Sequence, residues 1–256
     1  GDDEYTDFLT VSYSSTDYVG HDFGVNSIEL QDTYLRLDLE IERLLNYLDT
    51  NVGEGNYSLF LTSDHGAAEV PSFLKDIDAP GGYVQKNMFT PLYATLKAKY
   101  GVSDLIKNIS NDQIFLNYDL IKSMQLDLVD VQEFIVNDII NYSAVSKAYT
   151  ATTMQTSYFK DGMEKTLQNG YNQKLSGDVL FTLKSGVIAY GPKGTTHGSG
   201  YTYDTHVPLL FYGNGIQKGK TFERTYVTDI APTISALLGI AFPSGATGSV
   251  IVKAIY

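Results

Sequence analysis

Residues 57–66 read YSLFLTSDHG, a run of apolar and β-forming residues that ends in a polar loop. The run predicts a short strand over residues 57–61. Upstream, apolar side chains recur every three or four residues between 27 and 49, which predicts one long amphipathic helix. Before this helix, residues 8–13 read FLTVSY and predict another strand. Strand, helix and strand in this order indicate a βαβ unit, whose two strands run parallel in one sheet.

Residues 83–160 show a different pattern, with shorter elements and no cluster of chemically reactive side chains. We expect helices over 86–100 and 127–142, a strand over 113–117 and a β-rich stretch over 145–153. Asp127 stands before the second helix, and aspartate is a favourable residue at the start of a helix. This region is predicted to be a smaller α/β subdomain inserted into the main fold.

The remainder of the chain is expected to return to the main fold. We expect a hairpin formed by residues 178–183 and 187–190, a strand over 207–212 and a helix over 230–238. Gly239 would end this helix.

The predicted fold class is therefore α/β: a mostly parallel sheet flanked by helices, with the inserted smaller α/β subdomain. The main fold would begin with residues 1–82, be interrupted by the insertion over 83–160, and resume over 161–256.

The amino-acid composition of the chain disfavours or excludes several classes of protein and of functional site. The formal net charge is −12, which disfavours binding to a nucleic acid backbone. No apolar run is long enough to predict a transmembrane segment. Cysteine is absent, which excludes disulfides, thiolate metal sites and cysteine nucleophiles, and is consistent with a periplasmic or cell-surface protein. An acidic protein that acts on an anionic substrate needs bound cations to supply positive charge.

All four histidines lie in polar or glycine-rich loops beside predicted strands. Asp17 and His21 follow the first predicted strand, and Asp64 and His65 follow the strand at 57–61. Carboxylates and imidazoles are usual zinc ligands. Parallel strands of a βαβ unit bring the loops after them to one sheet edge, where ligands bind in open α/β sheets. The two pairs therefore predict a site for two metal ions. The alternative is that each aspartate only stabilises a turn.

A third cluster occupies residues 194–206, which read GTTHGSGYTYDTH and contain His197 and His206. The glycines let the backbone approach a site closely. We favour His197 as the ligand. His206 directly precedes the strand at 207–212, so it is the alternative ligand or a residue that packs behind the site. For His197 to reach the same edge, that strand must run antiparallel or its leading loop must cross back, and the sequence leaves both open.

Three short segments carry a family resemblance: TDYVGH (16–21), SDHG (63–66) and THGS (196–199). In this order they resemble the last three metal motifs of the alkaline phosphatase superfamily. They look most like its type I phosphodiesterase/nucleotide pyrophosphatase branch and, within it, the bacterial phosphate-irrepressible alkaline phosphatases. The segments YDTHVP (203–208) and DIAPT (229–233) extend the resemblance, which covers most of the chain and matches the C-terminal part of such an enzyme.

The resemblance implies that Asp17, His21 and His197 bind one zinc ion, and that Asp64 and His65 bind a second. In the family, the second zinc also takes an aspartate and the Ser/Thr nucleophile from earlier in the chain, and no residue before Phe8 matches them. No catalytic residue is therefore assigned, and the nucleophile is expected upstream of Gly1. Hydroxyls near the motifs are the alternatives: Thr62, Ser63, Thr195, Thr196 and Ser199.

These implications predict a two-zinc hydrolase of phosphate monoesters or diesters. The 256-residue chain itself would be inactive and would hold at most one zinc ion well. Its partners would be the phosphate ester substrate and the missing N-terminal half, and uncovered strand edges would favour self-association. The alternatives are a non-catalytic metal-binding module, or a sulfatase or phosphomutase on the same fold.

Overall fold

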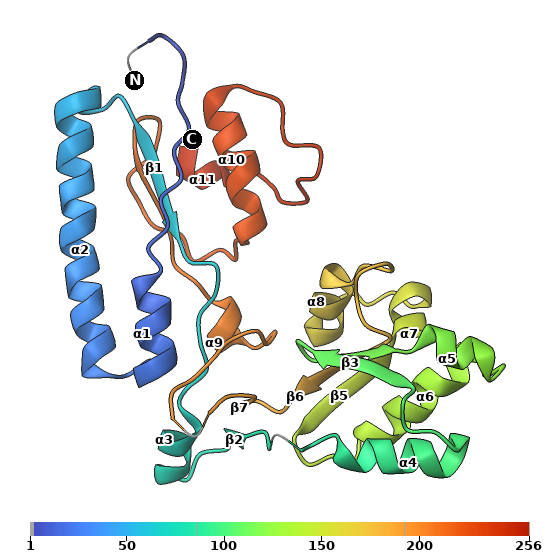
Figure 1. Cartoon of the computed structure of the whole chain (residues 1–256). Helices are drawn as coiled ribbons and strands as arrows, with labels where there is room; N and C mark the ends of the chain where they lie inside the picture. The colour runs from blue at the N-terminus through green and yellow to red at the C-terminus, as the bar shows by residue number, and fades with distance from the viewer. Residues whose placement is uncertain (1–2, 86, 192, 256) are drawn as a thin grey trace. The chain divides into compact units, whose positions relative to one another are not determined.

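The computed structural model describes residues 3–85, 87–191 and 193–255. The chain divides into two units. The first unit comprises Gly1–Thr16, Gln31–Asp64 and His206–Tyr256, and the second comprises Asp17–Leu30 and His65–Thr205. Figure 1 shows the helices and strands of both units.

Two predicted helices in or entering the first unit are confirmed. The helix predicted over 27–49 is α2 (Ile28–Leu48), and the Ser27 hydroxyl at its start accepts a hydrogen bond from the Leu30 amide. The last helix is α10 (Ile230–Leu238), which ends at Gly239 in a left-handed conformation with φ +65°. The other elements of the first unit are a π-helical turn (Asp49–Gly53), β1 (Ser58–Thr62), β8 (Leu209–Gly213), a 3₁₀ turn (Val227–Asp229) and α11 (Val252–Ile255). Helix α1 (Ser15–Phe23) belongs to the second unit from Asp17 onward.

Strands β1 and β8 of the first unit confirm the strands predicted over 57–61 and 207–212, each shifted by one or two residues. They pair antiparallel, with Phe60 opposite Phe211. This settles the direction that the sequence left open.

The strand predicted over 8–13 is wrong for the described structure. These residues form no strand, and Phe8 and Leu9 are 67% and 72% exposed. A β-forming sequence becomes a strand only when another strand takes its backbone hydrogen bonds, and the described residues supply none here. The βαβ unit is therefore absent, and the expected mostly parallel sheet is corrected to mainly antiparallel pairs in the described parts of the chain.

The second unit contains a four-stranded antiparallel sheet with the order β3-β4-β6-β5. The elements of this unit are α3 (Pro71–Asp76), β2 (Gly82–Tyr83), α4 (Thr90–Tyr100), β3 (Ile106–Ser110), β4 (Gln113–Leu116), α5 (Tyr118–Ser123), α6 (Leu128–Ile139), β5 (Val145–Thr150), α7 (Ala151–Thr156), α8 (Gly162–Gly170), β6 (Val179–Leu183), β7 (Val187–Ile188) and α9 (Thr202–Thr205).

The main hydrophobic core lies between this sheet and helices α4 and α6. Helix α6 begins where predicted, because the Asp127 carboxylate accepts hydrogen bonds from the Val129 and Asp130 amides. Val131, Ile135 and Ile139 follow at four-residue spacing and are fully buried. Helix α4 was expected to start at Lys86, which lies outside the described residues, and the described helix begins at Thr90.

The hairpin predicted over 178–190 is wrong. Strand β7 pairs parallel with β2, as Gly82 to Val187 and Tyr83 to Ile188, and β6 pairs with β4 and β5 instead. Strand β3 was not predicted; it joins β4 through Asn111 and Asp112, both with positive φ. Asparagine and aspartate tolerate this conformation, so the signal for a tight hairpin was present.

Shortening one core side chain tests this packing. We expect Ile135→Ala to destabilise the chain by about 2–5 kcal/mol, because Ile135 is fully buried in the core of the second unit. Ile140→Ala is the matched control, since Ile140 is 41% exposed, and its loss should be under about 1 kcal/mol. Urea unfolding followed by circular dichroism measures both. Equal losses in the two variants would contradict the assigned core.

Candidate metal centre

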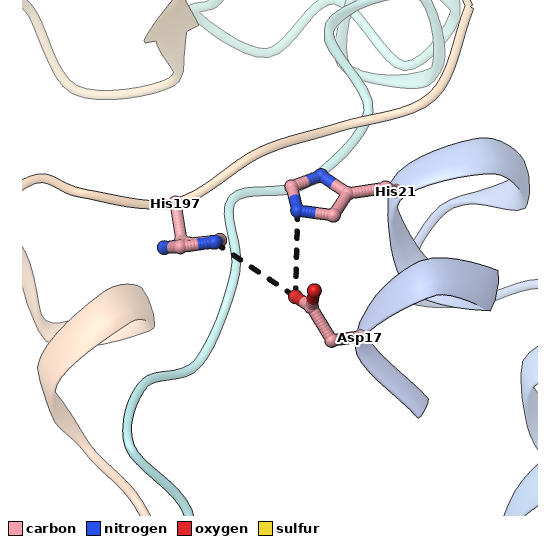
Figure 2. A group of neighbouring side chains, drawn as sticks. All are labelled: Asp17, His21 and His197. Carbon is pink, nitrogen blue, oxygen red and sulfur yellow. Dashed lines mark ion pairs between the residues drawn. The ribbon is translucent and has the colours of Figure 1, made fainter. Parts of the chain in front are cut away.

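Helix α1 supplies two side chains to the centre of the site. Asp17 and His21 lie one helical turn apart, and the distance from His21 Nε2 to Asp17 Oδ1 is 3.4 Å (Figure 2). A tight turn at Gly24, with φ +93°, follows the helix and packs against Val70. The four-residue spacing thus brings both side chains to one point, because it falls on a helix.

His197 approaches the same point from the glycine-rich loop. Its Nε2 lies 3.8 Å from Asp17 Oδ1, and one ligand atom each of Asp17, His21 and His197 lies within 4.8 Å of the others (Figure 2). Zinc bonds of about 2.1 Å in tetrahedral geometry place ligand atoms about 3.4 Å apart. One carboxylate oxygen and two imidazole nitrogens at these separations fit a divalent metal ion.

Thr195 fixes the loop against helix α1. It is fully buried, its amide donates to the His21 carbonyl at 3.1 Å, and its hydroxyl donates to the Ala68 carbonyl at 2.6 Å. In return, the Thr195 carbonyl lies 2.8 Å from His21 Nδ1. A carbonyl oxygen can only accept, so Nδ1 carries the proton and Nε2 presents its lone pair. The side chain of His21 is therefore set in the form that binds a metal ion.

His65 lies directly beside this group. Its Nδ1 lies 2.8 Å from the Gly66 carbonyl, which again leaves the lone pair on Nε2, 3.9 Å from Asp17 Oδ1. Its ring stacks on that of His197, with centroids 3.3 Å apart. The pKa of His197 is lowered, first by burial and then by the neighbouring His65, although the charge of Asp17 acts in the opposite direction. The neutral ring that results is the form that binds metals.

Two of the predicted site residues do not belong to the group formed by Asp17, His21 and His197. Asp64 and His206 lie in the first unit, and both are exposed. The Ser63 hydroxyl contacts Asp64 Oδ1 at 3.5 Å. In the described part of the chain, Asp17, His21 and His197 form the one group of three acidic or histidine side chains with this ligand spacing. The metal roles of Asp64, His65 and His206 remain predictions.

Three hydroxyls that were alternatives for the nucleophile donate to protein acceptors. Thr62 donates to the Pro208 carbonyl at 2.8 Å, Thr195 to that of Ala68, and Ser199 to the carboxylate of Asp204 at 2.6 Å. Each of these three hydroxyls is therefore already engaged in a hydrogen bond within the protein.

Asp204 is a supporting residue that the sequence analysis did not single out. Its side chain is 4% exposed, and Oδ2 accepts from both the amide and the hydroxyl of Ser199, two residues after His197. Its carbonyl accepts from the Gly66 amide at 2.7 Å. A Cβ atom on Gly66 would lie 2.1 Å from the Tyr203 carbonyl, so only glycine fits. Helix α9 therefore holds the His65 and His197 loops together.

None of the helices in the described ranges has the combination of length and apolar character needed to cross a membrane.

Comparisons with known proteins identify relatives of the chain. The chain is 42% identical over its full length to alkaline phosphatase PafA of Elizabethkingia meningoseptica, and covers 47% of it. Identity is 42% over 98% of the chain to a protein named calcium-transporting ATPase of Myroides odoratus, and 43% over 96% to alkaline phosphatase PhoV of Synechococcus elongatus. These matches cover 46% and 44% of the two relatives, so the chain spans about half the length of the proteins it matches.

The crystal structure of wild-type PafA matches the whole chain with a TM-score of 0.94 at 41% identity, and the match covers 49% of PafA. The fold is therefore α/β and alkaline phosphatase-like. The family model for type I phosphodiesterase / nucleotide pyrophosphatase matches residues 2–207. The chain belongs to the type I phosphodiesterase/nucleotide pyrophosphatase family.

Proposed function

We propose that this chain supplies the metal-binding part of a two-zinc hydrolase that acts on phosphate monoesters or diesters. The observation that supports it most is the convergence of Asp17, His21 and His197, with the lone pair of His21 already directed to the common point. The family contains phosphodiesterases, and two of the relatives are named alkaline phosphatases.

In this proposal Asp17, His21 and His197 hold one zinc ion, and Asp64 and His65 hold the second. The bound ions would polarise the phosphoryl group and offset its negative charge. The chain's own contribution is to position the ligands: Thr195 fixes His21, and Asp204 fixes the loop that carries His197. An acidic chain of net charge −12 could then bind an anionic ester.

We place the nucleophile outside these 256 residues, because three of the five candidate hydroxyls, those of Thr62, Thr195 and Ser199, donate to structural acceptors. A segment upstream would supply it, together with further ligands for the second zinc. A longer protein with that segment would then be the active form. Assays of it should include ATP beside p-nitrophenyl phosphate and its diester, since one relative is named an ATPase.

A non-catalytic metal-binding module is the second candidate, and it is supported by the same hydrogen-bonded hydroxyls. A sulfatase or phosphomutase would share the metal residues and differ around the nucleophile. We also propose a periplasmic or cell-surface location from the absence of cysteine. Fractionation of cells that express the natural gene would test the location.

Zinc titration tests the proposed metal site. We expect one tight zinc ion per chain, because Asp17, His21 and His197 form a three-ligand site, whereas Asp64 and His65 supply only two ligands to the second. His197→Ala should weaken the tight site by more than about a hundredfold, and His206→Ala should leave it unchanged. Competition with a chromophoric chelator measures both. Two equally tight ions, or a larger effect of His206→Ala, would overturn the assignment.

The supporting role of Asp204 gives a separate prediction. Asp204→Asn replaces one carboxylate oxygen with an NH₂ group, so it weakens the two hydrogen bonds that hold Ser199. We expect the affinity for zinc to fall about tenfold. Asp76→Asn, on the exposed end of α3, is the matched control and should leave the affinity unchanged. The same titration compares them, and an unchanged affinity in Asp204→Asn would show that the loop holds without this carboxylate.

A further inference from the structure

We propose that a polar cavity in the second unit, beside the end of β5 and the start of β6, binds a single neutral sugar ring. The cavity measures about 240 Å³, and its lining residues belong to α5, α6, α7 and the loop before β6. Its walls include Tyr118, Gln132, Gln155, Tyr171, Gln173 and Asp178. None of these residues takes part in the proposed zinc site, so the inference goes beyond the proposed hydrolase.

A buried amide without a full set of partners is the main observation. Gln132 is 2% exposed, and its Oε1 accepts a hydrogen bond from the Thr152 hydroxyl at 2.8 Å. Its Nε2 has no hydrogen-bond partner among the described residues. Nε2 is not one of the fully buried side-chain atoms that lack a partner, so it reaches the cavity, where an acceptor group of a ligand can bind it.

The charge of the wall excludes an anion as the ligand. The wall contains no lysine, arginine or histidine. Its one acid, Asp178, is 5% exposed and already accepts from the Leu116 amide at 2.8 Å and from the Tyr118 hydroxyl. The pKa of Tyr118 is raised by burial and by this hydrogen bond, so the phenol stays protonated. A phosphate group would meet a carboxylate here and no cation, and both oxygens of this carboxylate already accept hydrogen bonds from the protein, so the cavity favours a neutral ligand.

The remaining groups match a ring that carries several hydroxyls. Each glutamine side chain offers both donors and an acceptor, as each sugar hydroxyl does. Gln155 donates to the Tyr171 hydroxyl at 2.7 Å, which leaves the proton of that hydroxyl for another acceptor. Tyr118 and Tyr171 add flat apolar faces beside the polar groups. The volume is below the roughly 300–1,000 Å³ of pockets for drug-sized ligands, which suits one ring.

Saturation-transfer NMR on the 256-residue chain tests the proposal, because it observes the ligand and tolerates self-association of the protein. The probes are methyl glucoside, methyl galactoside and N-acetylglucosamine, and oligosaccharides that end in the same rings. We expect saturable transfer with a millimolar Kd for at least one ring. Gln173→Ala removes an exposed wall residue without disturbing the core and should weaken binding about fivefold. Gln217→Ala, in the first unit, should leave it unchanged.

Equal affinity for the free ring and the oligosaccharide would identify a free sugar as the natural ligand. Higher affinity for the oligosaccharide would identify the terminal ring of a glycan as the natural ligand. Both results support the proposal. The absence of saturable transfer from every probe would overturn it. Displacement of the sugar by inorganic phosphate, or equal weakening in Gln173→Ala and Gln217→Ala, would also overturn it, since either result places binding elsewhere or makes it anionic.

Discussion

The 256-residue chain alone is expected to hydrolyse p-nitrophenyl phosphate no faster than buffer with the same zinc concentration. Metal ions polarise the ester, but the covalent route also needs a positioned hydroxyl. The hydroxyls of Thr62, Thr195 and Ser199 all donate to structural acceptors. Loss of the nucleophile and of ligands to the second zinc together should lower the rate by several orders of magnitude, because residues that act as a unit fail as a unit.

The control for this prediction is a longer protein that contains the chain and an upstream segment. It should turn over p-nitrophenyl phosphate or its diester at alkaline pH, and Asp17→Ala in it should remove most of the activity. Rapid turnover by the short chain, abolished by Thr62→Ala or Thr196→Ala, would show that the nucleophile lies within these residues. Inactivity of the longer protein on every phosphate and sulfate ester would favour the non-catalytic module.

Features of the fold that depend on neighbours in sequence could be predicted. Helices α2, α6 and α10 repeat apolar residues at helical spacing, and local residues such as Asp127 and Gly239 mark where they begin or end. The centre of the candidate metal site was predictable for a related reason. Asp17 and His21 are four residues apart, and a helix brings such residues together whatever the rest of the fold does.

Features that depend on distant partners could not be predicted. Residues 8–13 and residues 58–62 have similar β-forming composition, but only the second set has a partner strand in the described chain. Strand β7 pairs with residues 82–83, about a hundred positions away, and no local signal distinguishes this pairing from the hairpin that we expected. The burial of Asp204 belongs to the same class, because aspartate side chains are usually exposed.

We expect the chain to self-associate in solution because the described part of its first unit exposes large apolar side chains and has strand edges without a strand partner. Phe8, Leu9 and Val11 are 67%, 72% and 52% exposed, and Leu210 and Tyr212 on β8 are 56% and 51% exposed. The β1–β8 sheet has two strands, so each has one edge without a strand partner among the described residues. Exposed apolar surface and open edges both favour contact with another chain. Sedimentation over a range of concentrations should reveal species larger than one chain.

Charge placed on the exposed segment should reverse this association. In Leu9→Lys/Val11→Lys, a second copy could cover the segment only by removing two ammonium groups from water, so the monomer should predominate. Leu175→Lys is the matched control, because Leu175 is 79% exposed but belongs to the second unit, and its association should match that of the original chain. If the original chain sediments as a monomer at every concentration, the exposed apolar residues of the first unit do not form an interface between copies of the chain. If both lysine variants dissociate equally, net charge rather than this segment controls the association.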